Sequence, residues 1–422
     1  MATEVNPTSG IPGIVSRALA EPVEPVTVGW MARIGVLLAG MWVAFYAPIN
    51  VLLALQAAAI DPAHKQFVFA LTSGVGAILS VLANPLVGTF SDRTDSRWGR
   101  RVPWVAGGAV LAAGSLALLS TASTVVVMIV GWCLVQLGVS TMQSAVTAVV
   151  PDQVPHRQRG TVGGVVGVST TVGILAGSAI GAAAGGVASG YLAAAGILVL
   201  ASLPFLLRSR DVRLPRQDRP PLRPMALLRG FWVSPRRHPD FAWAWLTRFL
   251  INLGNVCGTL YLLYYLQDAV HYPDPKGGVF VLVLLYSITV VATTLVGGRL
   301  SDRRGRRKIF VTVSGAIMAV ALVTLTLQSW PWAIVAALLL GAAYGVYLSV
   351  DFALMTELLP VAANRAKDLG VIAIAQNLPS VLAPLIASLI VTTLGGYRTL
   401  FLVAGGIALL GALLVTQIRG VA

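Results

Sequence analysis

The sequence predicts an all-α polytopic membrane protein, with twelve transmembrane helices in two pseudo-symmetric six-helix halves and both termini cytoplasmic. Three observations lead to this prediction: an apolar composition, apolar runs long enough to cross a bilayer, and basic residues collected in alternate links. Of the 422 residues, 56% are hydrophobic and only 11% are charged, whereas a soluble domain carries about 25% charged residues. Many of the apolar runs reach the roughly 20 residues that cross a hydrocarbon core.

The chain opens with a segment rich in Pro, Glu and small residues, which we expect to be a cytoplasmic tail rather than a signal peptide. The twelve spans that follow are expected at residues 34–58, 66–89, 102–120, 125–150, 161–186, 190–207, 241–266, 277–299, 309–328, 332–358, 369–393 and 398–417. The resulting domains are a tail at 1–33, a half at 34–207, a cytoplasmic loop at 208–240, a second half at 241–417 and a tail at 418–422. Three of the predicted turns are short, those at 120–124, 185–190 and 328–331. If one of them were not a turn, the number of spans would be odd and the termini would lie on opposite sides of the membrane.

The distribution of basic residues supports this parity. If both termini are cytoplasmic, the links on the other side of the membrane carry only Lys65, Lys276 and Arg398, three of the 30 basic residues. The others lie in cytoplasmic links or at cytoplasmic helix ends, as the positive-inside rule requires. The sequence therefore predicts a multi-pass protein of the cell's inner (plasma) membrane.

The longest link, Arg208 to Asp240, holds nine arginines and many prolines close to the middle of the chain. We expect it to be a hinge between the halves, with its arginines against anionic headgroups of the inner leaflet. A solvated loop that only fixes the topology explains the composition equally well.

Composition and motifs exclude several other classes of protein. The net charge of +14 does not indicate nucleic-acid binding, because the basic residues are spread over links between apolar runs. Cys133 and Cys257 both lie in apolar runs, and no His or Cys spacing suggests a metal site. The chain has no GxxxxGK[ST] phosphate loop and no nucleophile–base pattern. We therefore expect a protein that is not an enzyme and needs no cofactor. We expect an ion gradient to drive its activity.

The chain also repeats itself at about half its length. The segment "GTFSDR" at Gly88–Arg93 matches "GRLSDR" at Gly298–Arg303. "WMAR" at 30–33 is echoed by "WLTR" at 245–248, and "PDQVP" at 151–155 by "TELLP" at 356–360. Offsets of 205 to 215 residues, each at the corresponding span, indicate a duplication of six helices, which is a known transporter plan.

These motifs resemble a known family. Gly88-x-x-x-Asp92-Arg93 followed by Gly99-Arg100-Arg101 resembles the signature loop of the major facilitator superfamily, and the copy at 298–307 supports the resemblance over all twelve spans. The longer form "SDRTDSRWGRRVPW" is similar to the loop of the glycoside–cation symporter and sucrose-transporter branch. The segments "TRFLINLGN", "LYYLQD" and "YGVYLSVDFALMTELLP" resemble a bacterial group near that branch.

The charged links are candidates for a gate. A carboxylate at the end of the second span, Asp92, can meet an arginine of the cluster and the positive end of a neighbouring helix. The resemblance implies that such a lattice holds the two halves together at the cytoplasmic face and breaks when that side opens. Arginines that only fix the orientation remain the alternative. The residues assigned to this lattice are Asp92, Arg93, Arg97, Arg100, Arg101, Asp152, Asp302, Arg303, Arg306 and Glu357.

One acid lies well inside a span. Asp351 precedes Pro360 by nine residues, about 13 Å of helix, and an ionised carboxylate at that depth is a functional candidate. Apolar surroundings favour its neutral form, so a proton site is expected. Tyr344 and Tyr347 share its helix face and are candidates to bind the hydroxyl groups of a sugar-like ligand. A structural carboxylate paired to a basic or tyrosine side chain, within an internal hydrogen-bonded seam, is the alternative.

Further polar residues lie in spans that the resemblance implies line a central cavity. Each one alone is more often involved in helix packing than in ligand contact. Arg248, near the start of the seventh span, either extends to the interface or pairs with an acid. The other candidates for the cavity are Asn50, Gln143, Asn252 and Asn255.

A secondary active transporter of a small organic solute is the function that these features favour. The branch resemblance implies proton- or sodium-coupled uptake of a sugar or glycoside, although the first two spans lack the acids that relatives often use for cations. Proton-driven efflux of drugs or metabolites is the competing direction, although the fourth span has no arginine and the fifth no proline. A transporter-like receptor or lipid-handling protein is a third possibility. We favour a proton-coupled symporter that acts as a monomer, with Asp351 as the proton site.

Overall fold

The computed structural model describes residues 23–208, 239–304, 307–357 and 365–418, and this part of the chain is built of helices without a strand. A π-helical turn, Pro48–Leu52, joins the first two helices. In chain order the α-helices are α1 Val28–Ala47, α2 Leu53–Ile60, α3 Lys65–Asp92, α4 Val102–Ser120, α5 Val125–Gln153, α6 Arg159–Ala183, α7 Val187–Arg208, α9 Pro239–Leu260, α10 Leu262–Asp268, α11 Pro275–Arg304, α12 Arg307–Leu325, α13 Trp330–Glu357, α14 Arg365–Thr393 and α15 Gly396–Leu414.

Within the described residues, eleven spans are long and apolar enough to cross a membrane, the first being the unit Val28–Ile60. The bent pair α9 and α10 makes a twelfth if it is counted as one span. The prediction of twelve membrane-spanning helices in an all-α fold is therefore confirmed on this count. The first helix begins at Val28, six residues before the predicted start, because Thr27 caps it and accepts a hydrogen bond from the Trp30 amide.

The seventh predicted span is broken rather than continuous. Its two pieces, α9 and α10, meet at an angle of 46° around Tyr261. The tyrosine hydroxyls at the break donate to backbone carbonyls of other elements. Tyr264 bonds to Ala54 O at 2.7 Å and Tyr265 to Leu325 O at 2.8 Å. These bonds hold α10 as a short connector at one end of the molecule.

In the first half, α6 packs closely along α1. The row Gly173, Gly177 and Gly181 makes this approach possible. A Cβ atom added at Gly177 would lie 2.9 Å from the backbone nitrogen of Ala47, and one at Gly173 would lie 2.9 Å from Ala39 O. Only glycine leaves room for backbones this close, which is the packing role expected of a GxxxG row in a membrane.

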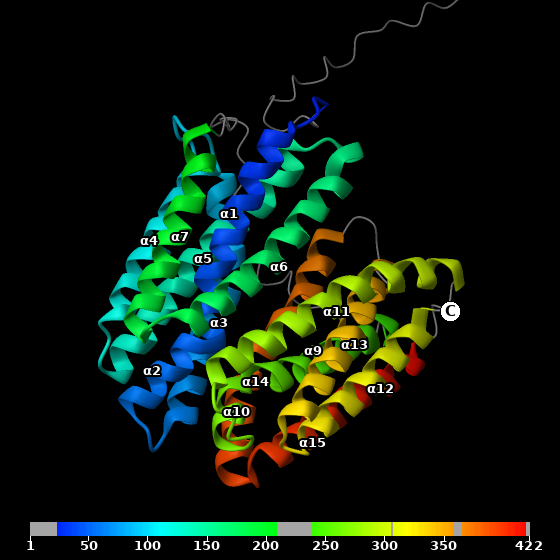
Figure 1. Ribbon diagram of the computed structural model, residues 1–422. Coiled ribbons are helices and arrows are strands. Elements are labelled where there is room, and N and C mark those ends of the chain that lie inside the picture. Colours follow the sequence, from blue (N-terminus) through cyan, green and yellow to red (C-terminus); the bar gives the residue numbers. More distant parts are fainter. Residues whose placement is uncertain (1–22, 209–238, 305–306, 358–364, 419–422) are drawn as a thin grey trace, which may run out of the picture.

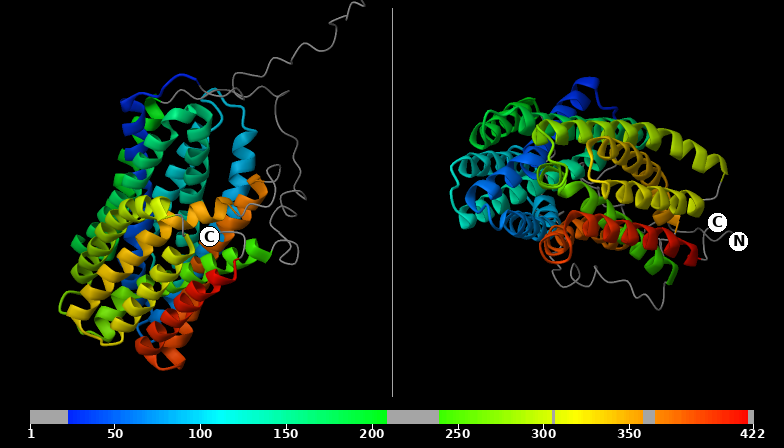
Figure 2. Two further views of the ribbon diagram at one scale, coloured as in Figure 1. Left: turned by 90° about the vertical axis from the view of Figure 1, so that its right-hand side faces the viewer. Right: turned by 60° about the horizontal axis from the view of Figure 1, so that its bottom comes forward.

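The two halves lie side by side, and α3 packs on α14 while α6 packs on α11. Figure 1 shows the two bundles meeting near α2 and α10 and diverging toward their other ends. The right-hand view of Figure 2 shows the same two groups of helices next to each other. We call the end with α2 and α10 the meeting end, and the end where α3 and α4 are joined the basic end.

Candidate transport site and charged links

A buried ion pair between α9 and α13 lies at the centre of the candidate site. Arg248 Nη1 donates a hydrogen bond to Asp351 Oδ2, and the two side chains are only 11% and 6% exposed. Arg248 lies nine residues after Pro239, the first residue of α9, which places it about 13 Å along the helix. The structure thus brings together two predicted site residues that are 103 positions apart, and Arg248 pairs with the acid instead of extending to the interface.

Two further side chains hold the ion pair in place. The Tyr347 hydroxyl, one helical turn before Asp351, donates to the second carboxylate oxygen, Oδ1, at 2.8 Å. Gln376 of α14 accepts a hydrogen bond from Arg248 Nη2 at 2.8 Å. Arg248 Nε is buried and has no hydrogen-bond partner among the described residues. The carboxylate therefore has a partner on both oxygens, whereas one of the three guanidinium nitrogens has none among the described residues.

The remaining predicted residues of α9 extend the network. Asn252 donates to Arg248 O at 2.8 Å and accepts from the Tyr344 hydroxyl at 3.0 Å. Asn255 accepts from the hydroxyl of Tyr286 in α11 at 3.2 Å, and the ring of Tyr286 stacks near that of Tyr344. Half-buried Tyr286 and Tyr344 therefore extend the network of polar side chains from α9 and α13 to α11.

The first half faces this cluster with residues of α1. Tyr46 lies near enough to Tyr344 and Tyr286 for their hydroxyls to interact electrostatically. Asn50, in the π-helical turn, instead donates to Ser178 of α6 at 2.9 Å, so it joins two helices of its own half. Gln143 of α5 is half-buried. The structure thus gathers the predicted residues of the second half into one network, and it does not join Asn50 and Gln143 to that network.

Tyr286, Gln376 and Tyr46 were not among the predicted site residues. Each is one of several scattered polar side chains in a largely apolar span, which is a weak signal in a sequence. Their position beside the ion pair depends on how α11, α14 and α1 pack around α9 and α13.

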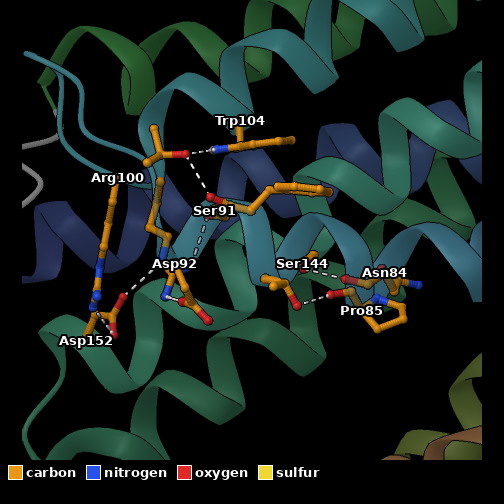
Figure 3. Close-up of polar contacts among 12 residues, drawn as sticks. Asn84, Pro85, Ser91, Asp92, Arg100, Trp104, Ser144 and Asp152 are labelled. Atoms are coloured by element: carbon orange, nitrogen blue, oxygen red, sulfur yellow. Dashed lines mark hydrogen bonds and ion pairs between the residues drawn. The ribbon is translucent and has the colours of Figure 1, made fainter. Parts of the chain in front are cut away.

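At the basic end, the link between α3 and α4 carries an ordered charge cluster (Figure 3). Asp152, at the end of α5, pairs with Arg100 at 2.7 Å and with Arg101 at 3.0 Å. Arg101 also reaches Asp92 at 2.5 Å and donates to Ser91 at 3.0 Å. The Arg101 side chain is 4% exposed, so this guanidinium is buried among three oxygen-bearing partners.

These ion pairs all belong to the first half. The resemblance led us to expect a lattice that joins both halves at this end, and in this conformation the described pairs of Asp92, Arg100, Arg101 and Asp152 do not cross between them. The two bundles diverge toward this end (Figure 1). Arg97 lies over the ring of Trp98, 5.1 Å from its centroid, and Arg93 caps the end of α3. The gating role of these residues stays a prediction.

The second copy of the charged link lies outside the side chains that the structure describes. This applies to the predicted gating residues Asp302, Arg303, Arg306 and Glu357.

At the meeting end, a charge cluster that the sequence analysis missed joins the two halves. Lys65, the first residue of α3, binds Asp268, the last residue of α10, with an Nζ–Oδ1 distance of 2.6 Å. Gln66 and Tyr397 donate to the other carboxylate oxygen of Asp268 at 3.3 and 3.0 Å. The only signal in the sequence was that Lys65 and Asp268 are opposite charges at links predicted on the same side of the membrane.

No group of three or more His, Cys, Asp or Glu side chains in the described residues is arranged to hold a metal ion. Both cysteines are free thiols.

Comparison with known proteins agrees with this architecture. Among solved structures, the nucleoside transporter NupG superposes with a TM-score of 0.71 at 13% identity, covering 92% of this chain and 98% of its own. A POT family transporter in complex with 5-aminolevulinic acid gives 0.73 at 13%, covering 92% and 95%. The human organic anion transporter TETRAN gives 0.66 at 18%, covering 93% and 100%. Identities this low show a shared fold.

Two curated proteins match over short stretches. The lactose permease of Lactobacillus delbrueckii subsp. bulgaricus is 48% identical over 59 residues, which are 14% of this chain and 9% of the permease. An uncharacterized symporter of Synechocystis sp. is 50% identical over 36 residues, 8% of this chain and 7% of that protein. The matched stretches thus span less than a tenth of either relative.

The family itself is shown by a match along nearly the whole chain. The sequence profile of the Major Facilitator Superfamily matches residues 32–289 and 278–419. Together with the helical architecture and the transporter structures that share it, this match shows that the chain belongs to the Major Facilitator Superfamily and is a multi-pass membrane transporter rather than an enzyme.

Proposed function

We propose that the protein is a proton-coupled symporter that carries a small polar organic solute, of the class of sugars and their derivatives, by alternating access. The observation that carries this proposal is the buried pair of Arg248 and Asp351. A carboxylate is the side chain that can gain or lose a proton in this setting, and intramembrane acids commonly serve proton relays. The short matches to a lactose permease and to a symporter support the branch and the substrate class.

Protonation of Asp351 is the coupling step in this proposal. The scheme takes the carboxylate as ionised in the described state, where Arg248 and the Tyr347 hydroxyl bind it. A proton on Asp351 removes the attraction between α13 and α9 and frees the guanidinium. Asn252, Tyr344 and Tyr286 then offer hydrogen-bonding groups and ring faces to the solute beside it.

Alternation between two states follows from the contacts between the halves. We assign the basic end to the cytoplasm, because basic links favour that side. In the described state the contact of Lys65 with Asp268 then joins the halves on the outer side, and the two bundles diverge toward the inside. Proton and solute drive the exchange by binding the two states with different affinities. In this scheme the carrier works as a monomer in the cell's inner membrane, powered by the proton gradient without a cofactor, with anionic lipids at its basic end.

External pH in a lightly buffered suspension of de-energised cells tests this function. Sugars, sugar acids and glycosides are added one at a time to cells with the wild-type protein or with Asp351→Asn. Alkalinisation that follows one solute and is lost in the variant is the expected result. Acidification on solute addition, or export of a loaded metabolite driven by an inward proton gradient, would instead assign the protein to proton-driven efflux.

A further inference from the structure

We propose that the solute carried with the proton bears an acidic group, such as a carboxylate, which replaces Asp351 as the partner of Arg248. This inference rests on the proposed proton symport and narrows its substrate class from sugars and their derivatives to those that carry an acidic group, such as sugar acids.

The arrangement around Arg248 leaves one guanidinium nitrogen without a partner among the described residues. Nη1 bonds to Asp351 and Nη2 to Gln376, whereas the buried Nε has no partner among the described residues. A guanidinium presents its N–H donors as a flat fork that matches the two oxygens of a carboxylate. When Asp351 is protonated and withdraws, Nη1 joins Nε as an unsatisfied donor. These donors then need acceptor oxygens, and an acid group on the solute would supply them.

The charge balance of the buried site leads to the same conclusion. With Asp351 ionised, the pair has no net charge. With Asp351 protonated and a neutral sugar bound, Arg248 is left as an uncompensated buried cation, which is strongly unfavourable. With Asp351 protonated and an organic anion bound, the site has no net charge again, and the guanidinium regains an anionic partner.

The side chains around the pair do not supply another negative charge. Among the described residues, the neighbours of the pair are the phenols of Tyr347 and Tyr344 and the amides of Asn252 and Gln376, and the phenols of Tyr286 and Tyr46 lie beyond Tyr344. Phenols and amides are neutral near pH 7. They can bind the hydroxyl groups of the solute, but they cannot replace the charge of Asp351.

The inference fixes the charge that moves in each cycle. One proton and one monoanion cross together, so the loaded carrier moves no net charge and its rate is insensitive to the membrane potential. Symport of one proton with a neutral sugar moves one positive charge and is accelerated by a negative interior.

The first test measures the melting temperature of purified protein against rising acetate. Asp351→Asn leaves Arg248 unpaired, so acetate should raise the melting temperature of this variant in a saturable way. The double variant Arg248→Gln/Asp351→Asn removes the cation as well and serves as the control for folding and for general salt effects. An equal response of the single and the double variant would overturn the inference.

The second test measures proton entry into liposomes that contain the purified protein and a pH dye. The solutes are three matched pairs: glucose and glucuronate, galactose and galacturonate, lactose and lactobionate. We expect at least one acid to drive proton entry more than tenfold faster than its neutral partner, with an equal rate at zero and at about −100 mV.

Two results separate a failure of the inference from a failure of the proposed function. Proton entry driven by a neutral sugar and accelerated at negative potential leaves proton symport standing and contradicts the acid group. Acetate stabilisation of Asp351→Asn without proton entry for any solute keeps the anion site and contradicts proton coupling.

Discussion

Lys65 and Asp268 join the two halves of the transporter through an ion pair of 2.6 Å at the meeting end. They belong to α3 and α10, two helices on opposite sides of the boundary between the halves. The Tyr264 ring lies under Lys65, 5.2 Å from Nζ, and its hydroxyl bonds to Ala54 O of the first half. Any motion that opens this end must separate these groups, so they favour the state in which it is closed.

Asp268→Asn should therefore shift the carrier toward the state that is open at the meeting end. The pair is partly exposed, 20% for Lys65 and 29% for Asp268, so its loss is worth about 0.2–1 kcal/mol, a population change of up to about fivefold. Distances between spin labels at Ala63 and His271, in links at this end, measure the change as growth of a longer-distance population.

The control for this variant is Asp274→Asn at the same end. The Asp274 carboxylate bonds to the amide of Gly277 in its own half. This control should leave the distance distribution unchanged. Equal distributions for Asp268→Asn and the wild type would show that Lys65 and Asp268 do not hold this end closed.

At the basic end, Arg101 should matter more for stability than Asp92. Arg101→Gln removes a buried cation from Asp152 and Asp92, and breaking a buried pair costs about 3–5 kcal/mol. Asp92→Asn removes a carboxylate that is 47% exposed, and the cost of losing such a pair is below about 1 kcal/mol. The free energies of unfolding of the two variants in mild detergent measure the difference. An equal loss of stability would contradict the burial of the Arg101 side chain.

The ion pair of the site predicts strong coupling between two substitutions. Arg248→Gln and Asp351→Asn each leave one buried charge without its partner, at a cost of about 3–5 kcal/mol. The double variant leaves neither charge, so its free energy of unfolding should lie closer to that of the wild type than that of either single variant. Additive losses in this double-mutant cycle would mean that the two side chains do not interact.

The glycine row on α6 offers a test of the packing between α6 and α1. Gly177→Val forces a side chain against the backbone at Ala47 and should destabilise the protein by about 1–3 kcal/mol or more. Gly167→Val on the same helix meets open space and serves as the matched control for helix propensity. Thermal unfolding of both variants distinguishes them, and equal melting temperatures would contradict the close approach at Gly177.

Most of the fold could be predicted from the sequence, because the length and polarity of a membrane span are set locally by the bilayer. The predicted span 102–120 coincides with α4, and Asp92 meets an arginine of its own link as expected. The break at Tyr261 was missed, because no proline marks it and side-chain bonds to distant carbonyls hold it.

The candidate site was predicted only as separate residues. Asp351 could be identified by its depth in a span, and Arg248 by its place in an apolar run. Their pairing depends on the packing of α9 against α13. The pair of Lys65 and Asp268 could not be predicted for the same reason, because each residue alone looks like an ordinary charge at a helix end. Long-range pairs of this kind leave no local pattern in a single sequence.

The most direct test of the account compares two kinds of transport by Asp351→Asn in proteoliposomes, using the solute identified by the pH assay. Exchange of labelled for unlabelled solute requires binding and alternation, whereas uphill accumulation also requires proton coupling. The account predicts that Asp351→Asn retains exchange and loses accumulation driven by a proton gradient. Normal accumulation of the solute by this variant would contradict the assignment of Asp351 as the coupling group.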